Sequence, residues 1–370
     1  MKVLIKGEKM SLSKNMVVES LKKLIDLNTG KSLVDTKSVE SVDIVDDKAN
    51  LKICLGYPAK NYAETLNHMI IDRLSSDNID CGTVEVTWKI VSHSVQKSLQ
   101  PMQNIKNVIA VASGKGGVGK STTAVNLALA LAAEGSKVGI LDADIYGPSQ
   151  PRMLGLSGQP DSEDGKSLEP MENYGLQAMS IGFLIDEETP MIWRGPMVTQ
   201  ALEQLLSDTK WRDLDYLVID LPPGTGDVQL TLAQKIPVSG AVIVTTPQDI
   251  ALLDARKGLK MFEKVEVPVL GIVENMSIHI CGKCGNEESI FGEGGGSSLA
   301  NESNVDLLGK LPLDISIREQ TDSGKPSVVF EPSGRVAEIY GEIARKAAGK
   351  LAAQSKDYSA KFPKIVIENN

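Results

Sequence analysis

The sequence is poor in aromatic residues, in cysteine and in long apolar runs, and each scarcity excludes a class of protein. Phe, Trp and Tyr make up 4% of the 370 residues, so we expect a core built from aliphatic side chains. Four cysteines are too few for a disulfide-stabilised scaffold in a chain of this length. No apolar run is long enough to span a membrane, and the first residues lack the apolar segment and cleavage site of a secretory signal. These absences predict a globular protein of the cytoplasm.

Positive charge is also in short supply. The chain has 39 Lys and Arg residues against 48 Asp and Glu residues, a formal net charge of −9. An acidic balance argues against a nucleic acid or an anionic membrane as the main partner, because both attract basic surfaces. We therefore expect no nucleic-acid partner and no membrane partner.

Two stretches of the chain differ in their hydrophobic pattern. Within residues 1–93, helical and strand patterns alternate, and residues 82–90 place apolar side chains at every second position, so we expect a small α+β domain. Residues 94–104 are polar and unpatterned and are interpreted as a linker. Across residues 105–353, short apolar runs are separated by helical or loop segments, which predicts an α/β domain: a mostly parallel sheet with helices on both faces. Residues 354–370 are expected to form a C-terminal tail.

The stretch GKGGVGKST follows one of these apolar runs and precedes a helical pattern, and it fits the phosphate-loop signature G-x-x-x-x-G-K-[ST]. Its glycines let successive backbone N–H groups surround an anion, and the following helix adds its positive N-terminal end. Lys120 can reach the terminal phosphates of a nucleotide, and the Ser121 hydroxyl can ligate Mg²⁺. We expect the nucleotide to be bound by Gly114, Lys115, Gly116, Gly117, Val118, Gly119, Lys120, Ser121 and Thr122.

Three carboxylates follow other apolar runs of the same part of the chain. Asp142 and Asp144 are two residues apart, so on an extended backbone both would face the phosphates. Asp220 precedes the sequence PPGTG, a loop able to sense a γ-phosphate. We expect Asp142 and Asp220 to support Mg²⁺, and Asp144 to act in catalysis by orienting the attacking water.

Cys281 and Cys284 form a C-x-x-C pair, with one glycine between the two cysteines and another directly after them. One pair supplies two ligands, whereas zinc sites and iron–sulfur clusters usually need four. Two-fold symmetry would supply the missing ligands if each protomer of a homodimer contributed its pair to one shared site. A bridging cluster, a zinc ion and an unmetallated pair all remain open at this point. Cys54 and Cys81 stand alone and are interpreted as inert, partly buried thiols, and His279 as a loop residue.

These motifs together resemble those of a known family. KGGVGKST is similar to the deviant Walker A motif of MinD/ParA-type ATPases. DADIYGPS, WRGPM at 193–197, DLPPGTGD, and ENMS followed by C-x-x-C resemble the Mrp-type iron–sulfur cluster carriers, the ApbC-like branch of that superfamily. The resemblance covers about residues 105 to 350. The N-terminal part, with LIDLNTGKSLVD, is similar to the small domain fused ahead of many Mrp-type ATPases.

The resemblance implies an ATPase that works as a homodimer, with ATP held between the two subunits. It assigns Lys115 to the partner's phosphates, as a second catalytic lysine beside Lys120, and Asn275 to a hydrogen bond with adenine. It also implies a labile [4Fe–4S] cluster, held at the dimer interface by Cys281 and Cys284 of both chains. Such a carrier would receive the cluster from a donor and pass it to apo iron–sulfur proteins.

One departure and two alternatives accompany this interpretation. Relatives of the N-terminal domain often carry a TPACP-like stretch, but Ala59 occupies the position of its cysteine here, so we expect a docking or structural role for this domain. A MinD/ParA-like positioning ATPase would need a basic amphipathic C-terminal helix or basic surfaces. A zinc-stapled dimeric ATPase would act on another cargo. The tail sequence KIVIENN could add a strand to a partner's sheet or dock on its own domain.

Overall fold

The structure is a computed structural model that describes residues 11–97, 99–185, 195–281 and 283–356. The chain divides into two compact units, with the boundary between Lys89 and Ile90. The predicted tail lies outside the described residues from position 357 onward, and so do the first two residues of the WRGPM motif. Among the residues that are described, no helix is long and apolar enough to cross a membrane.

The first unit packs two helices against a three-stranded sheet of order β1-β2-β3. β1 and β2 form an antiparallel hairpin, and β3 joins β2 in parallel after the crossover through α2. In β3 the apolar side chains are partly buried and their neighbours exposed, as the alternating pattern predicted. The elements are α1 (Lys14–Lys22), β1 (Val39–Val45), β2 (Lys48–Leu55), α2 (Ala63–Ser76) and β3 (Cys81–Trp88).

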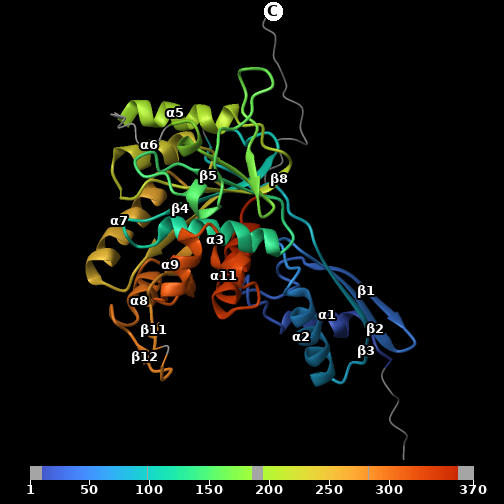
Figure 1. The fold of residues 1–370 in the computed structure, drawn as a ribbon. Helices are drawn as coiled ribbons and strands as arrows, with labels where there is room; N and C mark the ends of the chain where they lie inside the picture. The colour runs from blue at the N-terminus through green and yellow to red at the C-terminus, as the bar shows by residue number, and fades with distance from the viewer. Residues whose placement is uncertain (1–10, 98, 186–194, 282, 357–370) are drawn as a thin grey trace, which may run out of the picture. The chain divides into compact units, whose positions relative to one another are not determined.

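The second unit is built on an eight-stranded sheet of order β13-β10-β9-β4-β8-β5-β7-β6, shown in Figure 1. Each neighbouring pair is parallel except β6 and β7. The strands are β4 (Ile105–Ala112), β5 (Val138–Asp142), β6 (Met171–Asn173), β7 (Leu176–Ser180), β8 (Leu214–Asp220), β9 (Gly240–Thr245), β10 (Val269–Glu274) and β13 (Leu307–Lys310). A separate hairpin consists of β11 (His279–Ile280) and β12 (Glu287–Glu288).

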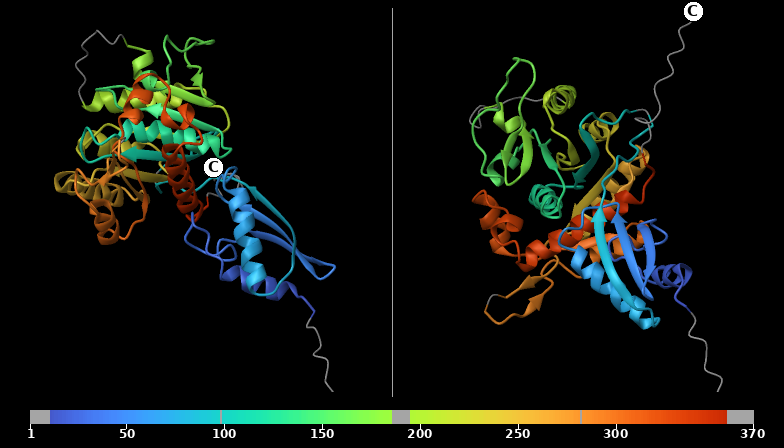
Figure 2. Two further views of the ribbon diagram at one scale, coloured as in Figure 1. Left: turned by 60° about the horizontal axis from the view of Figure 1, so that its bottom comes forward. Right: turned by 90° about the vertical axis from the view of Figure 1, so that its right-hand side faces the viewer.

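Helices cover both faces of this sheet (Figure 1; Figure 2). α3 and α11 pack together on one face, and α5, α6 and α7 follow one another on the other. The helices are α3 (Lys120–Ala133), α4 (Gln150–Met153), the 3₁₀ turn η1 (Ile181–Phe183), α5 (Gly195–Asp208), α6 (Asp227–Lys235), α7 (Asp249–Lys264), α8 (Gly295–Glu302), α9 (Ile315–Asp322), α10 (Ser327–Phe330) and α11 (Arg335–Ala352). The predicted fold class is therefore confirmed.

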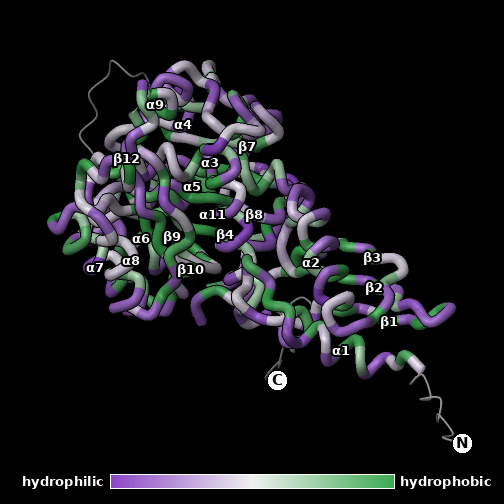
Figure 3. Tube along the Cα trace, turned by 90° about the horizontal axis from the view of Figure 1, so that it is seen from below, coloured by the Kyte–Doolittle hydropathy of each residue, from purple (hydrophilic) through white to green (hydrophobic). Residues whose placement is uncertain are grey.

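The central strands are buried on both faces, which explains why they are apolar throughout. Every residue of β5 and of β9 is buried, and β8 has one partly exposed position. Figure 3 shows β4 and β9 in the colours of hydrophobic residues, surrounded by more polar segments. The core is mostly aliphatic, as the scarcity of aromatic residues predicted.

The sheet topology creates a crevice where the connections from two neighbouring strands diverge. β4 leads through α3 to β5, whereas its neighbour β8 leads through α6 to β9 on the opposite side of β4. In open α/β sheets, ligands bind at the carboxyl ends of strands at such a switch point. The segments that leave β4 and β8 there are the glycine-rich loop and the PPGTG loop. They contact each other, because the Gly224 N–H donates to the Ser113 carbonyl at 3.0 Å.

The predicted linker is partly packed on the second unit. The Gln96 amide donates to the Ala233 carbonyl at 2.7 Å, and its oxygen accepts from the Val238 N–H at 3.1 Å. Gln96 is buried, so this part of the segment has a fixed place beside the end of α6.

Candidate functional site

The glycine-rich loop, residues 113–119, has the backbone that its sequence predicts. Gly117 and Gly119 have φ angles of 79° and 82°, in the left-handed region that favours glycine. Gly119 directly precedes α3, so the helix N-terminus faces the loop's interior. Gly114 packs against the backbone of α7: a Cβ atom there would lie 2.2 Å from the carbonyl carbon of Asp254. Glycine is therefore required at this point by a close approach of two backbones.

Lys120 is buried at the centre of the loop. Its ammonium group pairs with Asp220, lies 3.8 Å from the Asp144 carboxylate and donates to the Ser121 hydroxyl at 3.2 Å. Lys120 is 5% exposed and Asp220 is fully buried, so each charge depends on the other for compensation. A cavity of about 280 Å³ opens beside this pair and is lined by the loop, by Lys115 and by Asp144. The structure thus brings the predicted phosphate-binding lysine and two of the predicted carboxylates together.

Asp142 has four hydrogen-bond donors of its own. It accepts from the N–H groups of Asp144, Ser149 and Gln150 and from the Ser180 hydroxyl, at 2.9–3.1 Å. Complete burial and the nearby Asp220 carboxylate raise the pKa of Asp142 to about 7. These contacts fix the segment between β5 and α4. The sequence did not indicate this structural role of Asp142.

Asp144 occupies a different environment at the rim of the phosphate cavity. Burial raises the pKa of its carboxyl group, and the positive charge of Lys120 opposes that rise. A carboxylate whose pKa is raised beside a phosphate cavity is suited to accepting a proton from water.

Gln150 is a residue of the site that sequence reasoning missed. Its side-chain amide donates to Asp220 at 2.9 Å and to the Ser121 carbonyl at 3.1 Å, so it fixes the carboxylate relative to the first turn of α3. Gln150 is 1% exposed. The only sequence signal is its place at the start of a short helix after the DADIYGPS motif, and that says nothing of where the side chain points.

A second, more apolar cavity of about 750 Å³ adjoins the loop on its other side. Gly117, Gly119 and Thr122 form one wall, and residues of the 275–280 and 312–322 segments form the others. The Asn275 amide donates to the Val118 carbonyl at 2.9 Å and accepts from the Met276 N–H at 2.9 Å. Asn275 therefore supports the phosphate loop and also lines this cavity.

The cysteine pair lies on the turn of the β11–β12 hairpin, which projects beside α8 and α9 in Figure 1. The Cys281 N–H donates to the Asn286 carbonyl, and the Gly285 N–H donates to the Cys281 carbonyl, both at 2.9 Å. Cys281 is partly exposed and Cys284 is exposed. Backbone N–H groups of Lys283 and Cys284 lower the pKa of the Cys281 thiol, which favours the thiolate that metals bind.

Within the described residues, no group of three or more His, Cys, Asp or Glu side chains is arranged to hold a metal ion. The described part of one chain thus offers the thiol pair without further ligands beside it. Cys54 and Cys81 are free and partly buried, and burial raises the pKa of Cys81, in keeping with inert thiols.

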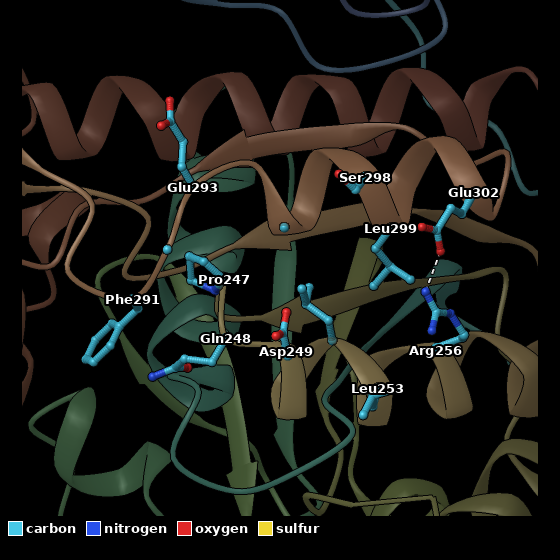
Figure 4. Close-up of a pocket in the computed structure, with 13 residues that line it drawn as sticks. Pro247, Gln248, Asp249, Leu253, Arg256, Phe291, Glu293, Ser298, Leu299 and Glu302 are labelled. Atoms are coloured by element: carbon cyan, nitrogen blue, oxygen red, sulfur yellow. Dashed lines mark hydrogen bonds and ion pairs between the residues drawn. The ribbon is translucent and has the colours of Figure 1, made fainter.

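A third cavity, of about 700 Å³, lies between the first half of α7 and α8 (Figure 4). Arg256 reaches towards Glu302 and forms an ion pair with it at one end, and Phe291 and Gln248 lie at the other. Asp249 and Glu293 add negative charge to its lining. This acidic cavity has no part of the glycine loop among its lining residues.

Comparison with known proteins identifies the family. Residues 104–348 match the family described as "NUBPL iron-transfer P-loop NTPase", and residues 14–86 match the family "Iron-sulfur cluster assembly protein". The "Iron-sulfur cluster carrier protein" of Pseudomonas fragi is 59% identical over 270 residues, 72% of this chain and 94% of the relative. The protein of that name from Escherichia coli strain K12 is 51% identical over 331 residues, 88% of this chain and 89% of the relative.

A solved structure agrees with this placement. The nucleotide-binding protein from Archaeoglobus fulgidus, in complex with ADP, has 40% sequence identity and a TM-score of 0.55. The match covers 64% of this chain and 93% of that protein. The resemblance drawn from the motifs is thus confirmed, and the chain belongs to the family of NUBPL iron-transfer P-loop NTPases.

Proposed function

We propose that this protein is an ATPase that carries an iron–sulfur cluster between two copies of the chain and delivers it to apoproteins. The observation that carries the proposal is the combination of a complete phosphate loop with a pair of thiols, one partly exposed and one exposed, on a hairpin of the same domain. The relatives named as iron–sulfur cluster carriers support the cargo, and the family's P-loop NTPase fold supports the ATPase activity.

Lys115 and Lys120 both line the phosphate cavity, and we propose a different role for each. Lys120 binds the terminal phosphates and gives up its pairing with Asp220 when they arrive. Lys115 lines the same cavity from the rim, where a lysine can serve the phosphates of a facing subunit. A positive charge supplied from the partner offsets charge on the transferring phosphoryl group, so hydrolysis would depend on dimer formation.

We propose different roles for the three carboxylates of the site. Ser121 and Asp220 would hold Mg²⁺, which supplies charge compensation at the phosphates when bound. Asp142 would support the metal site indirectly, because its oxygens already accept hydrogen bonds from the loop that carries Asp144. Asp144 orients and deprotonates the attacking water. Asn275 lines the apolar cavity, which we assign to the nucleoside. It holds the phosphate loop through its bond to Val118 and would also hydrogen-bond to adenine.

The thiol pair supports a shared cluster. Cys281 and Cys284 of one chain supply two thiolates, and the same residues of a second chain complete the four that a [4Fe–4S] cluster needs. An exposed cluster with divided ligands is easily released to an apoprotein, and it is easily received from a donor. A cluster of this kind suits a reducing compartment such as the cytoplasm.

The described surface gives less support to a positioning ATPase. α11 is amphipathic, but its apolar face is buried against α3 and includes Tyr340, Ile343, Ala347 and Leu351. A helix committed to its own domain does not present that face to a membrane.

Anaerobic reconstitution with iron and sulfide tests the proposal. Wild-type protein should take up iron and show the broad visible absorption of a cluster, and Cys281→Ala and Cys284→Ala should abolish both while ADP still binds. Cys54→Ala is the matched control and should behave as wild type. Stoichiometric zinc without iron uptake would instead favour the zinc-stapled dimer.

A further inference from the structure

The strand that leads into Cys281 also forms a wall of the apolar cavity beside the phosphate loop. On one side this cavity is lined by Gly117 and Gly119, and on another by His279 and Ile280 of β11. Ile290, which follows β12, lines it as well. Both ends of the cysteine hairpin therefore border the space that the proposed function assigns to the nucleoside.

Hydrogen bonds join this wall to the neighbouring segment 311–313. The Ser277 N–H donates to the Leu311 carbonyl at 2.9 Å, and the Leu313 N–H donates to the Ile278 carbonyl at 2.8 Å. The His279 ring continues the series, because its Nδ1 lies 3.1 Å from the Leu313 carbonyl, an acceptor to which it must donate. The side chain of His279 thus extends the backbone ladder by one step towards the cysteines.

Beyond Ile280, the backbone hydrogen bonds of the described hairpin residues lie within the hairpin itself. The Cys281–Asn286 and Gly285–Cys281 hydrogen bonds close its turn. A half-exposed ion pair of 3.8 Å between Glu287 and Arg335 adds little, since such pairs are weak in water. Order in the hairpin therefore depends on how firmly its base is attached, by the two backbone bonds to Leu311 and Leu313 and by the His279 side chain.

We propose that His279 is a positioning residue that couples the nucleoside cavity to the cysteine hairpin within a single chain. A base in the cavity packs against Ile280 and against the 312–315 segment, and the His279 bond to Leu313 holds these two walls together. Filling the cavity then opposes local opening of the hairpin's base and orders the turn that carries the thiols. By linkage, ligation of the thiols tightens nucleotide binding by the same factor. This inference rests on the proposed function, because it requires the nucleoside in this cavity.

Hydrogen exchange followed by mass spectrometry tests the coupling on the full chain, with ADP as the probe. Peptides that cover 113–125 report nucleotide binding, and peptides that cover 277–290 report the hairpin. We compare the wild type with His279→Ala, which removes the donor, and with His279→Asn, which keeps a donor near the Nδ1 position. His68→Ala, at an exposed position of the first unit, is the matched control.

ADP should slow exchange in the loop peptides of all four proteins. In the wild type, His279→Asn and His68→Ala it should also slow hairpin exchange by at least about fivefold, the lower end of usual coupling between sites. In His279→Ala the hairpin effect should fall below about twofold, by the same scale. If that variant does not fold, His279→Phe fills similar space without a donor.

The possible failures are distinguishable. Hairpin protection that is as strong without the His279 donor as with it overturns the role of His279. Protection of the loop peptides without any effect on the wild-type hairpin overturns the coupling but leaves the proposed function standing. No protection of the loop peptides contradicts the nucleotide-binding part of the proposed function, and the coupling with it.

Discussion

Replacing Lys120 by Met should destabilise the nucleotide-free protein as well as impair its activity. The ammonium group of Lys120 is almost fully buried against the fully buried Asp220 carboxylate. Removing one partner of such a pair leaves an uncompensated charge, which costs about 3–5 kcal/mol. Gln150 still donates to Asp220 at 2.9 Å, so we expect a value near the lower end, about 3 kcal/mol.

Urea unfolding of the nucleotide-free protein measures this cost. Asp220→Asn alone should also destabilise the fold, but the double variant should be more stable than the sum of the single effects predicts, because it removes both charges. Lys257→Met is the control: the Lys257 side chain is 66% exposed in its ion pair with Asp254, so its loss should cost under about 1 kcal/mol. A cost below about 1 kcal/mol for Lys120→Met, additive with Asp220→Asn, would refute the reasoning that the two buried charges compensate each other.

Three further predictions concern the same site. Gly114→Ala should abolish ATP hydrolysis because its Cβ would meet the α7 backbone at 2.2 Å. Gly258→Ala, within α7 itself, is the control: its added Cβ would have no described atom within 4 Å outside its own helix backbone and chain neighbours, so it should retain activity in a phosphate-release assay. Gln150→Leu should raise the Mg²⁺ concentration needed for half-maximal hydrolysis by about tenfold, since Asp220 loses its fixed orientation; an unchanged Mg²⁺ dependence would remove Gln150 from the site. The pKa of Asp142 is raised to about 7, above the value of about 3.9 in an unfolded chain, so the folded state binds the extra proton and its stability should fall as the pH rises from about 4 to 7. Across this pH range the free energy of unfolding of the wild type should fall by no more than about 4 kcal/mol, and Asp142→Asn should lessen that fall. If urea titrations show the same pH dependence for Asp142→Asn as for the wild type, the assigned cause is contradicted.

The elements with strong local patterns could be predicted from the sequence. The glycine loop, the buried strands and the final helix follow from glycine spacing and apolar periodicity, and the structure has each of them. The loop motif and the motifs that follow it also led to the family, which the comparisons confirm.

The contacts between distant segments could not be predicted in this way. Asp142 was expected beside Mg²⁺ because its spacing from Asp144 suggested a shared face, but its partner Ser180 comes from a strand 38 residues later. His279 was interpreted as a loop residue, whereas it lies in β11 and bonds to Leu313, 34 residues away. Such partners are set by the order of strands in the sheet, and no local periodicity encodes it.

The central claim is that two chains share one cluster, and native mass spectrometry of the anaerobically reconstituted protein tests it most directly. We predict a dimer that carries one [4Fe–4S] cluster per two chains, with Cys281→Ala and Cys284→Ala remaining free of iron. A cluster found on a single chain, or iron retained after both cysteines are replaced, would contradict the account.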